Sequence, residues 1–374
     1  MAKILFIAAN EWPNWGGSEL LWTQTAEKMA RRGAKVFVSV PDFGKPLKQV
    51  ERLRAAGCQV FARARPALPL RLAARIFRFP DQVRKQVRGM ARDADLVVIS
   101  QGAHTDGLPW MEEVSDIRQG YAVIAQGAPE HGWPEDDVAE RLARAYENAS
   151  RSFFVSQALL DLCRRQFGTP LSNGRVIRNP FNVGYGARPP WPDDGSEELT
   201  LACVARIDVG TKGQDLLLRV LSLPHWRERK VRLSLVGGGS NERVLRRYAE
   251  QLKVKGVEFL GHREDIEEVW SKHQAMVLPS RQEGMALTLV EAMLCGRACI
   301  VTDVGGSREL VRDGVNGFLA KAPTVELLDE AMNRAWENRE RLREMGERAA
   351  EDVRKWVSAD PAEDFVRELE ALVE

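Results

Sequence analysis

The sequence predicts an α/β protein of two domains, each built on a parallel sheet. Short apolar runs, each of the length of a buried strand, alternate along the chain with segments of helical pattern. Several runs end in glycine-rich or polar turns, which is typical of βαβ units. A length of 374 residues exceeds the usual size of one domain, so two domains of ordinary size are expected.

Composition and charge narrow the class of protein. Hydrophobic residues make up 44% of the chain and charged residues 29%, which is typical of a packed globular protein rather than of a disordered one. The net charge of +1 gives no reason to expect a nucleic acid as partner. No apolar run approaches the ~20 residues of a membrane span. A strand pattern starts at residue 3, so we expect no signal peptide and a cytoplasmic protein.

The cysteines indicate neither a metal site nor a disulfide framework. All five stand in apolar surroundings, without the paired spacing of a zinc site. We therefore expect reduced thiols and no metal ion. The five are Cys58, Cys163, Cys203, Cys295 and Cys299.

The first domain opens with a βαβ unit. Residues 3–9 read as a buried strand, residues 19–32 as a helix and residues 36–40 as the next strand. The loop between the first strand and the helix holds Gly16 and Gly17, which let the backbone approach a ligand closely. The Gly-x-Gly-x-x-Gly pattern of dinucleotide sites is absent, which disfavours a nicotinamide oxidoreductase. A tight turn without a ligand is the alternative interpretation of the loop.

A basic segment, residues 63–92, follows in the first domain. It holds nine lysines or arginines and one acidic residue, with apolar and aromatic side chains between them. Such a segment can lie against an anionic membrane surface. We favour two ordinary helices with solvated basic faces, broken at Pro80, and keep peripheral membrane contact as the alternative.

A polar, proline-rich stretch at residues 189–196 reads as a linker. We place the domain boundary near residue 185, so that the domains are residues 1–185 and 186–355. The remaining strands are expected at residues 96–100, 121–125, 153–156, 199–205, 231–236, 257–261, 275–278 and 298–302.

Residues 278–319 carry the strongest functional pattern. Strand, loop, helix and strand follow one another as a βαβ unit, in which ligands bind beyond the carboxyl ends of the strands. Glu283 lies in the loop and Glu291 lies inside the expected helix. Between them, the amides around residues 286–289 form a helix N-terminus, which suits a phosphate. The pattern predicts two hydroxyl acceptors beside an anion site; two solvated surface glutamates are the alternative.

Two basic residues are expected at the same edge of the second sheet. Arg206 ends a predicted strand, and Lys212 directly precedes a helix expected over residues 214–221. A fixed arginine and lysine beside a helix N-terminus suit a diphosphate and can stabilise charge on a leaving nucleotide. Structural salt bridges are the alternative role.

On these residues the chain resembles the GT-B glycosyltransferases of the family 4 type. The signature of that family is a glutamate, seven further residues and a second glutamate followed by Ala-Met. Glu283, Glu291, Ala292 and Met293 match this signature. The resemblance covers residues 200–320 well and the N-terminal half only loosely.

The resemblance implies a fold and a reaction. We expect a GT-B protein with two Rossmann-like domains facing across a cleft, and a last helix, residues 356–374, that crosses back to the first domain. The implied reaction moves a sugar from a nucleoside-diphosphate sugar to an acceptor hydroxyl, which belongs to a glycan, a lipid-linked sugar or a small molecule. It proceeds with retention of configuration and without a metal ion or other cofactor. The alternatives are a nucleotide-sugar epimerase of similar fold and a non-catalytic nucleotide-sugar-binding protein.

Roles for single residues also come from the resemblance. Glu283 is expected at the donor sugar, Glu291 at the nucleotide ribose, and Arg206 and Lys212 at the diphosphate. Further substrate contacts are expected from Gly16, Gly17, Gly237, His262, Arg263, Gly284, Met285, Ala286, Leu287, Thr288 and Leu289.

One position departs from the pattern of the family. Many members end a strand of the first domain in a histidine that contacts the donor sugar, and this chain has Gln126 there. We expect Gln126 to take that role. His104 and His131 lie a few residues beyond two predicted strands and are the alternatives.

Overall fold

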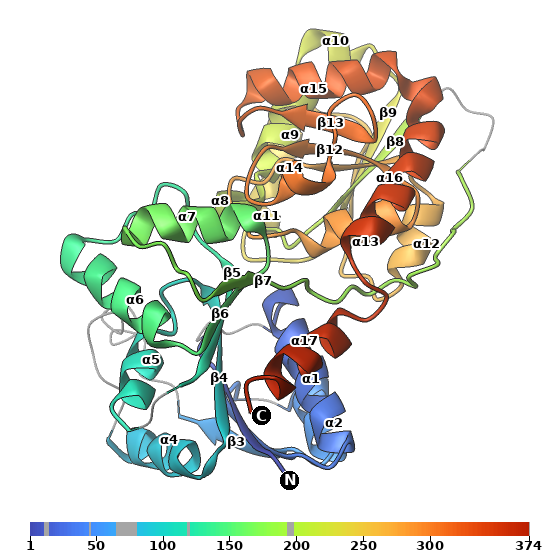
Figure 1. The fold of residues 1–374 in the computed structure, drawn as a ribbon. Coiled ribbons are helices and arrows are strands. Elements are labelled where there is room, and N and C mark those ends of the chain that lie inside the picture. The colour runs from blue at the N-terminus through green and yellow to red at the C-terminus, as the bar shows by residue number, and fades with distance from the viewer. Residues whose placement is uncertain (11–14, 45, 65–80, 118–119, 193–197, 374) are drawn as a thin grey trace. The chain divides into compact units, whose positions relative to one another are not determined.

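The computed structural model describes residues 1–10, 15–44, 46–64, 81–117, 120–192 and 198–373 (Figure 1). The chain divides into two compact units. The first unit comprises Met1–Pro180 and Asp360–Glu374, and the second comprises Phe181–Ala359. Each unit holds one sheet, and every strand pair in both sheets is parallel. The predicted α/β class is therefore confirmed.

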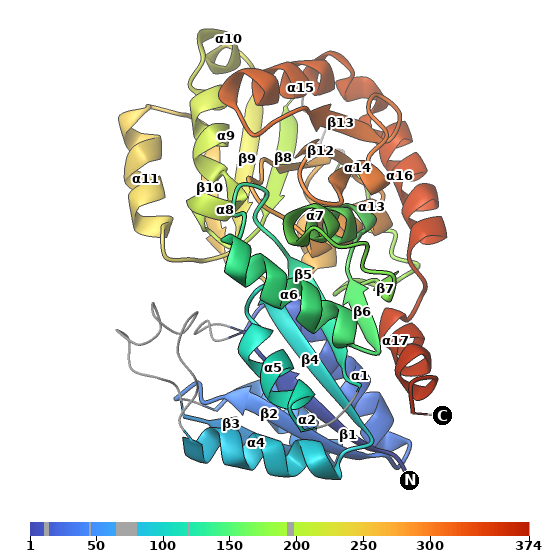
Figure 2. The same cartoon turned by 60° about the vertical axis from the view of Figure 1, so that its left-hand side comes forward.

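The first unit is a seven-stranded sheet in the order β3-β2-β1-β4-β5-β6-β7. Its central strands are continuous apolar runs, because a parallel sheet is covered by helices on both faces. Helices α4 to α7 form one layer, and α1, α2 and α17 form the other (Figure 2). The strands are β1 Lys3–Ala8, β2 Lys35–Pro41, β3 Gln59–Arg63, β4 Leu96–Ala103, β5 Ala122–Gly127, β6 Arg151–Phe154 and β7 Gly174–Val176. The helices are η1 Gly17–Glu19, α1 Leu20–Arg31, α2 Lys48–Ala55, α4 Asp81–Asp93, α5 Leu108–Ser115, α6 Asp136–Asn148, α7 Gln157–Phe167 and α17 Pro361–Glu370.

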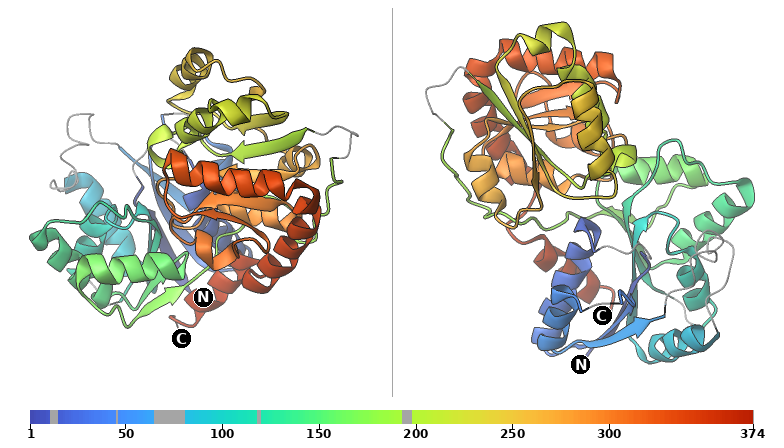
Figure 3. Two further views of the ribbon diagram at one scale, coloured as in Figure 1. Left: turned by 90° about the horizontal axis from the view of Figure 1, so that it is seen from above. Right: turned by 180° about the vertical axis from the view of Figure 1, so that it is seen from behind.

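The second unit is a six-stranded sheet in the order β10-β9-β8-β11-β12-β13, with helices on both faces (Figure 3). The strands are β8 Leu199–Val204, β9 Val231–Val236, β10 Val257–Gly261, β11 Ala275–Leu278, β12 Ala298–Thr302 and β13 Gly317–Ala320. The helices are α8 Val209–Lys212, α9 Gln214–Leu221, α10 Pro224–Arg227, α11 Glu242–Gln251, α12 Ile266–Ser271, α13 Leu287–Leu294, α14 Ser307–Leu310, α15 Val325–Glu337, η2 Arg339–Arg341 and α16 Leu342–Trp356.

The C-terminal segment differs from the single helix expected over residues 356–374. Helix α16 ends at Trp356, and α17 begins at Pro361 after a break. The break has a local cause, since a proline is favoured in the first turn of a helix and disfavoured in its interior. The Asp360 side chain caps α17 by accepting from the Glu363 backbone N–H at 3.0 Å.

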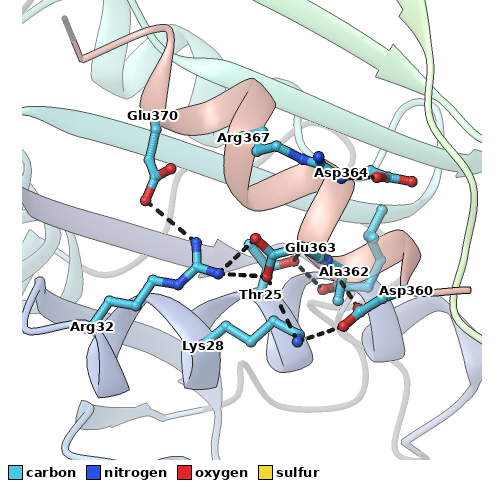
Figure 4. Close-up of polar contacts among 10 residues, drawn as sticks. Thr25, Lys28, Arg32, Asp360, Ala362, Glu363, Asp364, Arg367 and Glu370 are labelled. Atoms are coloured by element: carbon cyan, nitrogen blue, oxygen red, sulfur yellow. Dashed lines mark hydrogen bonds and ion pairs between the residues drawn. The ribbon is translucent and has the colours of Figure 1, made fainter.

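Helix α17 is an integral part of the first unit. Phe365, Val366 and Leu369 are buried in the core, together with residues of the central strands and of α1. The Phe365 and Phe153 rings meet edge-on, with their centroids 5.0 Å apart. Polar contacts also join the α17 segment to α1 (Figure 4). The Lys28 ammonium pairs with Asp360 at 2.7 Å, and the Arg32 guanidinium pairs with Glu363 at 2.6 Å and Glu370 at 3.7 Å. Exposed pairs contribute about 0–1 kcal/mol each, so the apolar side of α17 supplies most of the stabilisation.

The basic segment is only partly described, because residues 65–80 lie outside the described residues. Its C-terminal part forms α4, where Arg84 and Arg88 both pair with Glu113 of α5 at 2.7 Å. No described helix is both long enough and apolar enough to cross a membrane. Membrane contact through residues 63–92 stays a prediction.

We predict that the substitution Phe365→Ala lowers the free energy of unfolding of the first unit by about 3–5 kcal/mol, because it opens a cavity in a closed core. Urea unfolding of the full chain measures this change. Glu368→Ala, at an exposed position of the same helix, is the matched control and should change stability by less than about 0.5 kcal/mol. Equal stabilities of the two variants would show that α17 is dispensable for the core.

Candidate functional site

The candidate site of the second unit lies at the carboxyl ends of β8, β11 and β12. The loops that leave these strands approach one another so closely that side chains are excluded at two positions. Gly213 has φ +65°, and a Cβ there would lie 2.1 Å from the Pro279 carbonyl oxygen. Gly305 has φ +57°, and a Cβ there would lie 2.4 Å from the carbonyl oxygen of Glu283. Only glycine fits both the backbone conformation and the space.

Arg281 ties two of these loops together. Its backbone N–H donates to the Thr211 carbonyl at 2.8 Å, and its guanidinium donates to the Val209 carbonyl at 2.7 Å. The same guanidinium binds both carboxylate oxygens of Asp215, at 2.6 and 2.8 Å. The loop that carries Glu283 is therefore fixed against the turn that carries Lys212.

Lys212 and Glu283 meet directly in this frame. The Lys212 Nζ lies 2.6 Å from Glu283 Oε1, and the Ser280 hydroxyl donates to the same oxygen at 2.7 Å. The Glu283 side chain is 8% exposed and that of Lys212 is 21% exposed. A partly buried ammonium and a nearly buried carboxylate thus stand together at the edge of the sheet.

Arg206 is placed differently from Lys212. Its guanidinium pairs with Asp208 at 3.0 Å, and its side chain is about half exposed. Within the described part of the chain it forms no ion pair with Glu283. The structure therefore brings Lys212 to Glu283, whereas the Arg206 side chain, just after β8, stays accessible to solvent.

Glu291 is buried inside α13. Its Oε1 accepts hydrogen bonds from the Asn182 backbone N–H at 2.9 Å and the Asn182 amide Nδ2 at 2.8 Å. Burial raises the pKa of the Glu291 carboxyl, and the two bonds from Asn182 oppose that rise. Sequence reasoning missed Asn182, since the two residues are 109 positions apart and no local pattern joins them.

The N-terminus of α13 lies between the two glutamates. Its N-cap residue is Ala286, and no side chain caps it. The first-turn amides therefore present their dipole end without a side-chain acceptor, which suits an anion. Of the residues predicted here, Leu287 and Thr288 are partly exposed, whereas Gly284, Met285, Ala286 and Leu289 are buried. A ligand at this helix end would meet backbone N–H groups rather than the Leu289 side chain.

Three further predicted residues belong to the same edge of the sheet. Gly237 follows β9, and its N–H donates to the Gly261 carbonyl at 2.8 Å. His262 and Arg263 follow β10, the edge strand, and both are exposed. Within the described residues, these three form no hydrogen bond or ion pair with Lys212 or Glu283.

In the first unit, Gln126 stands at the end of β5 and is almost buried. It forms a reciprocal amide pair with Asn179, in which Gln126 Nε2 donates at 3.1 Å and Asn179 Nδ2 donates back at 2.7 Å. His131 is exposed in the following loop. His104 is buried, and its ring stacks on Phe167 with centroids 5.4 Å apart, which is an interior packing position.

The glycine loop of the first unit is organised by a buried carboxylate. Glu19 Oε2 accepts from the Gly16 N–H at 3.1 Å and the Ser18 hydroxyl at 2.5 Å, and Oε1 accepts from Asn10 Nδ2 at 3.0 Å. Gly17 begins the short helix η1. Trp15 packs between the rings of Trp22 and Phe43 (centroid distances 5.8 and 5.7 Å). The Gly16-Gly17 backbone is therefore held in one conformation.

No group of three or more His, Cys, Asp or Glu side chains that could hold a metal ion occurs among the described residues. The second-unit site holds charged side chains and the N-terminus of α13. Together they offer a cation, a carboxylate and free amides to a ligand.

Comparison with known proteins identifies similar chains. A family model described as glycosyl transferases group 1 matches residues 193–352, and one described as glycosyltransferase family 4 matches residues 15–185. The N-acetyl-alpha-D-glucosaminyl L-malate synthase of Bacillus anthracis is 36% identical over 124 residues, which are 33% of this chain and 32% of that protein. The N,N'-diacetylbacillosaminyl-diphospho-undecaprenol alpha-1,3-N-acetylgalactosaminyltransferase of Campylobacter jejuni is 31% identical over 116 residues, 31% of either chain. The matched segments thus span about a third of these relatives.

A solved structure of similar fold is that of HepE from Anabaena in complex with UDP-glucose. It aligns with a TM-score of 0.77 over 99% of this chain and 100% of its own, at 22% identity. At this identity the likeness concerns the fold.

We predict that Asn182→Ala lowers the free energy of unfolding by about 1.5–3 kcal/mol at neutral pH, because it removes a donor from a buried carboxylate. Burial raises the pKa of Glu291. The contribution of the Glu291 carboxyl to the free energy of unfolding is therefore fully present below its ordinary pKa of 4.5 and is lost as the pH rises through the raised pKa. The hydrogen bonds from Asn182 favour the ionised form of Glu291. The cost of the substitution should therefore be largest at neutral pH and shrink toward acid, as unfolding measured across pH would record.

The matched control is the same substitution in a Glu291→Gln background. No charge is left there, so Asn182→Ala should cost clearly less at neutral pH and show little dependence on pH. A cost that is equal in both backgrounds at every pH contradicts the assigned contact.

Proposed function

The chain belongs to the GT-B glycosyltransferases of the family 4 type, and from this premise we propose that it moves a sugar from a nucleoside-diphosphate sugar to an acceptor hydroxyl with retention of configuration. The observation that carries the proposal is the contact of Lys212 with Glu283 beside the uncapped N-terminus of α13. It joins a cation for a diphosphate and a carboxylate for a sugar hydroxyl at the carboxyl edge of a parallel sheet. The UDP and UDP-glucose bound in the HepE structures support the choice of donor class.

Lys212 and Arg206 are proposed to bind the donor diphosphate. As the bond from the sugar carbon to the phosphate oxygen breaks, negative charge grows on the departing phosphate. An ammonium held in place stabilises that charge more in the transition state than in the ground state, which raises turnover. Because Lys212 is fixed by Glu283 whereas Arg206 is half exposed, Lys212 is the better placed of the two.

Retention is proposed to follow from attack on the face that the phosphate leaves. The acceptor oxygen forms its bond to the sugar carbon while the carbon–phosphate oxygen bond breaks, and the acceptor proton passes to the departing phosphate. No protein nucleophile takes part. Positive charge comes from Lys212, Arg206 and the α13 amides, so the proposal needs no metal ion.

Glu291 is proposed to bind the nucleotide ribose. Its Oε1 already accepts two hydrogen bonds from Asn182, so Oε2 is the oxygen that accepts from ribose hydroxyls. This role differs from that of Glu283, which meets the donor sugar. Loss of Glu291 should weaken nucleotide affinity, whereas loss of Glu283 should lower turnover.

From the first unit, Gln126 is proposed to contact the donor sugar. Asn179 uses one donor and one acceptor of the Gln126 amide and leaves a second N–H and a second lone pair for hydroxyl groups. The Gly16-Gly17 backbone is proposed to face the diphosphate and the acceptor. His131 is the alternative sugar contact.

The proposal is tested with a panel of UDP- and GDP-sugars. We predict that one nucleoside diphosphate raises the melting temperature, since a ligand at 100 times its Kd stabilises the native state by about 2.7 kcal/mol. The matching sugar nucleotide should release nucleoside diphosphate faster when acceptor hydroxyls are present. If a sugar nucleotide is converted to its epimer without an acceptor, the protein is an epimerase. If a sugar nucleotide binds but is not turned over, the protein is a binding protein. Neither binding nor turnover across the panel overturns the proposal.

In the same assay we predict that Lys212→Ala and Arg206→Ala each lower kcat/KM on the order of 10²-fold or more, by loss of a charge-stabilising donor. Lys212→Arg should restore little of the lost kcat/KM, because a planar guanidinium does not replace a compact ammonium. Arg219→Ala, at an exposed position on α9, is the matched control and should retain activity. Circular dichroism checks the fold of each variant. Folded variants of near-normal kcat/KM would place the diphosphate elsewhere.

A further inference from the structure

A chain of hydrogen bonds runs from the end of β12 to the accessible ammonium of Lys212. The Thr302 hydroxyl donates to the Ser280 carbonyl oxygen at 2.6 Å. The Ser280 hydroxyl donates to Glu283 Oε1 at 2.7 Å, and Lys212 Nζ donates to the same oxygen at 2.6 Å. Thr302 is the last residue of β12, and Ser280 follows β11 by two residues. The chain thus joins two neighbouring strand ends to the two charged groups of the site.

Exposure rises along this chain. Thr302 and Ser280 are each 1% exposed, the Glu283 side chain 8% and the Lys212 side chain 21%. The buried Ser280 hydroxyl has a single proton and no access to solvent, so that proton is committed to Glu283. The series of hydrogen bonds begins at Thr302, the last residue of β12, and ends at the Lys212 ammonium, which a ligand can reach.

The two oxygens of Glu283 are used unequally. Oε1 accepts from both Ser280 and Lys212, whereas Oε2 accepts no hydrogen bond from the residues that the structure describes. With Oε1 held from two sides, rotation of the carboxylate is restrained and Oε2 keeps one direction. Lys212 has three N–H donors, of which Glu283 takes one.

We infer that Ser280 and Thr302 are positioning residues for sugar transfer. They fix Glu283 Oε1 and, through it, the Lys212 ammonium, so that Glu283 Oε2 and the remaining Lys212 donors meet the substrate in a set geometry. This inference rests on the proposed function, which places Glu283 at the sugar and Lys212 at the diphosphate. Neither Ser280 nor Thr302 is proposed to touch the substrate.

The physical reason is preorganisation. A carboxylate that is free to rotate must be ordered again in each catalytic cycle. A small displacement of a positioned group lowers the turnover rate rather than the affinity for the ligand. If Ser280 only completed the packing of its loop, its removal would lower stability and nucleoside diphosphate affinity together. A positioning role predicts a fall in kcat with that affinity unchanged.

The test compares Ser280→Ala with the wild type in steady-state kinetics, nucleoside diphosphate binding and thermal unfolding. We expect kcat to fall on the order of tenfold, the loss of one hydrogen bond to a charged group, while the Kd of the nucleoside diphosphate stays within about twofold. Thr302→Val should cause a smaller fall. Thr302→Ser keeps the hydroxyl and should retain most of the activity.

A double-mutant cycle shows whether Ser280 acts through Glu283. In a Glu283→Ala background, the further change Ser280→Ala should leave the residual kcat unchanged. The inference is overturned if Ser280→Ala has wild-type kcat, or if the tenfold fall persists without Glu283. A wild-type protein that neither binds nor turns over any nucleotide sugar overturns the proposed function, and this inference with it. A wild type that turns over beside an unaffected Ser280→Ala overturns the inference alone.

Discussion

The ion pair between Lys212 and Glu283 is the contact on which the candidate site depends. The two residues stand 71 positions apart, on turns that follow different strands, and meet at 2.6 Å in a setting where Glu283 is nearly buried. A carboxylate loses hydration there, so it needs both the ammonium and the Ser280 hydroxyl as partners. Gly213 lets the Lys212 turn approach the Pro279 carbonyl, and Gly305 lets the loop after β12 approach the backbone of Glu283.

The parallel sheets explain why the charged groups gather. In a parallel sheet all strands end at the same edge, so residues just beyond β8, β11 and β12 become neighbours whatever their distance in sequence. Helix α13 adds its N-terminus at this edge. Arg281 then locks the loop of Glu283 to the turn of Lys212 through Val209 and Asp215. The loop of Glu283 is thus held in place at the ends of the strands.

The two glutamates of the signature have different surroundings, and this difference suits different tasks. Glu283 shares one oxygen with a cation and a hydroxyl, and its other oxygen accepts no hydrogen bond from the described residues. Glu291 is held by neutral donors of Asn182, and burial raises its pKa. Asn182 lies two residues past Pro180, the last residue of the N-terminal part of the first unit. The carboxylate proposed for the ribose therefore also anchors the start of the second unit.

The sequence by itself determined the α/β class, the central strands and the placement of Glu283 on a loop and Glu291 on a helix. These features have local signals, because strands covered on both faces are continuous apolar runs and a βαβ unit alternates its patterns within a few tens of residues. Strands β3, β7 and β13 were missed, and all three are edge strands, of five, three and four residues. Short edge strands give weak apolar signals. Only the tertiary structure decided the partners: Ser280 for Glu283, Asn182 for Glu291 and Asn179 for Gln126. The last two pairs are 109 and 53 positions apart, and a hydrogen bond between distant residues depends on how the strands and helices pack, which no local pattern records.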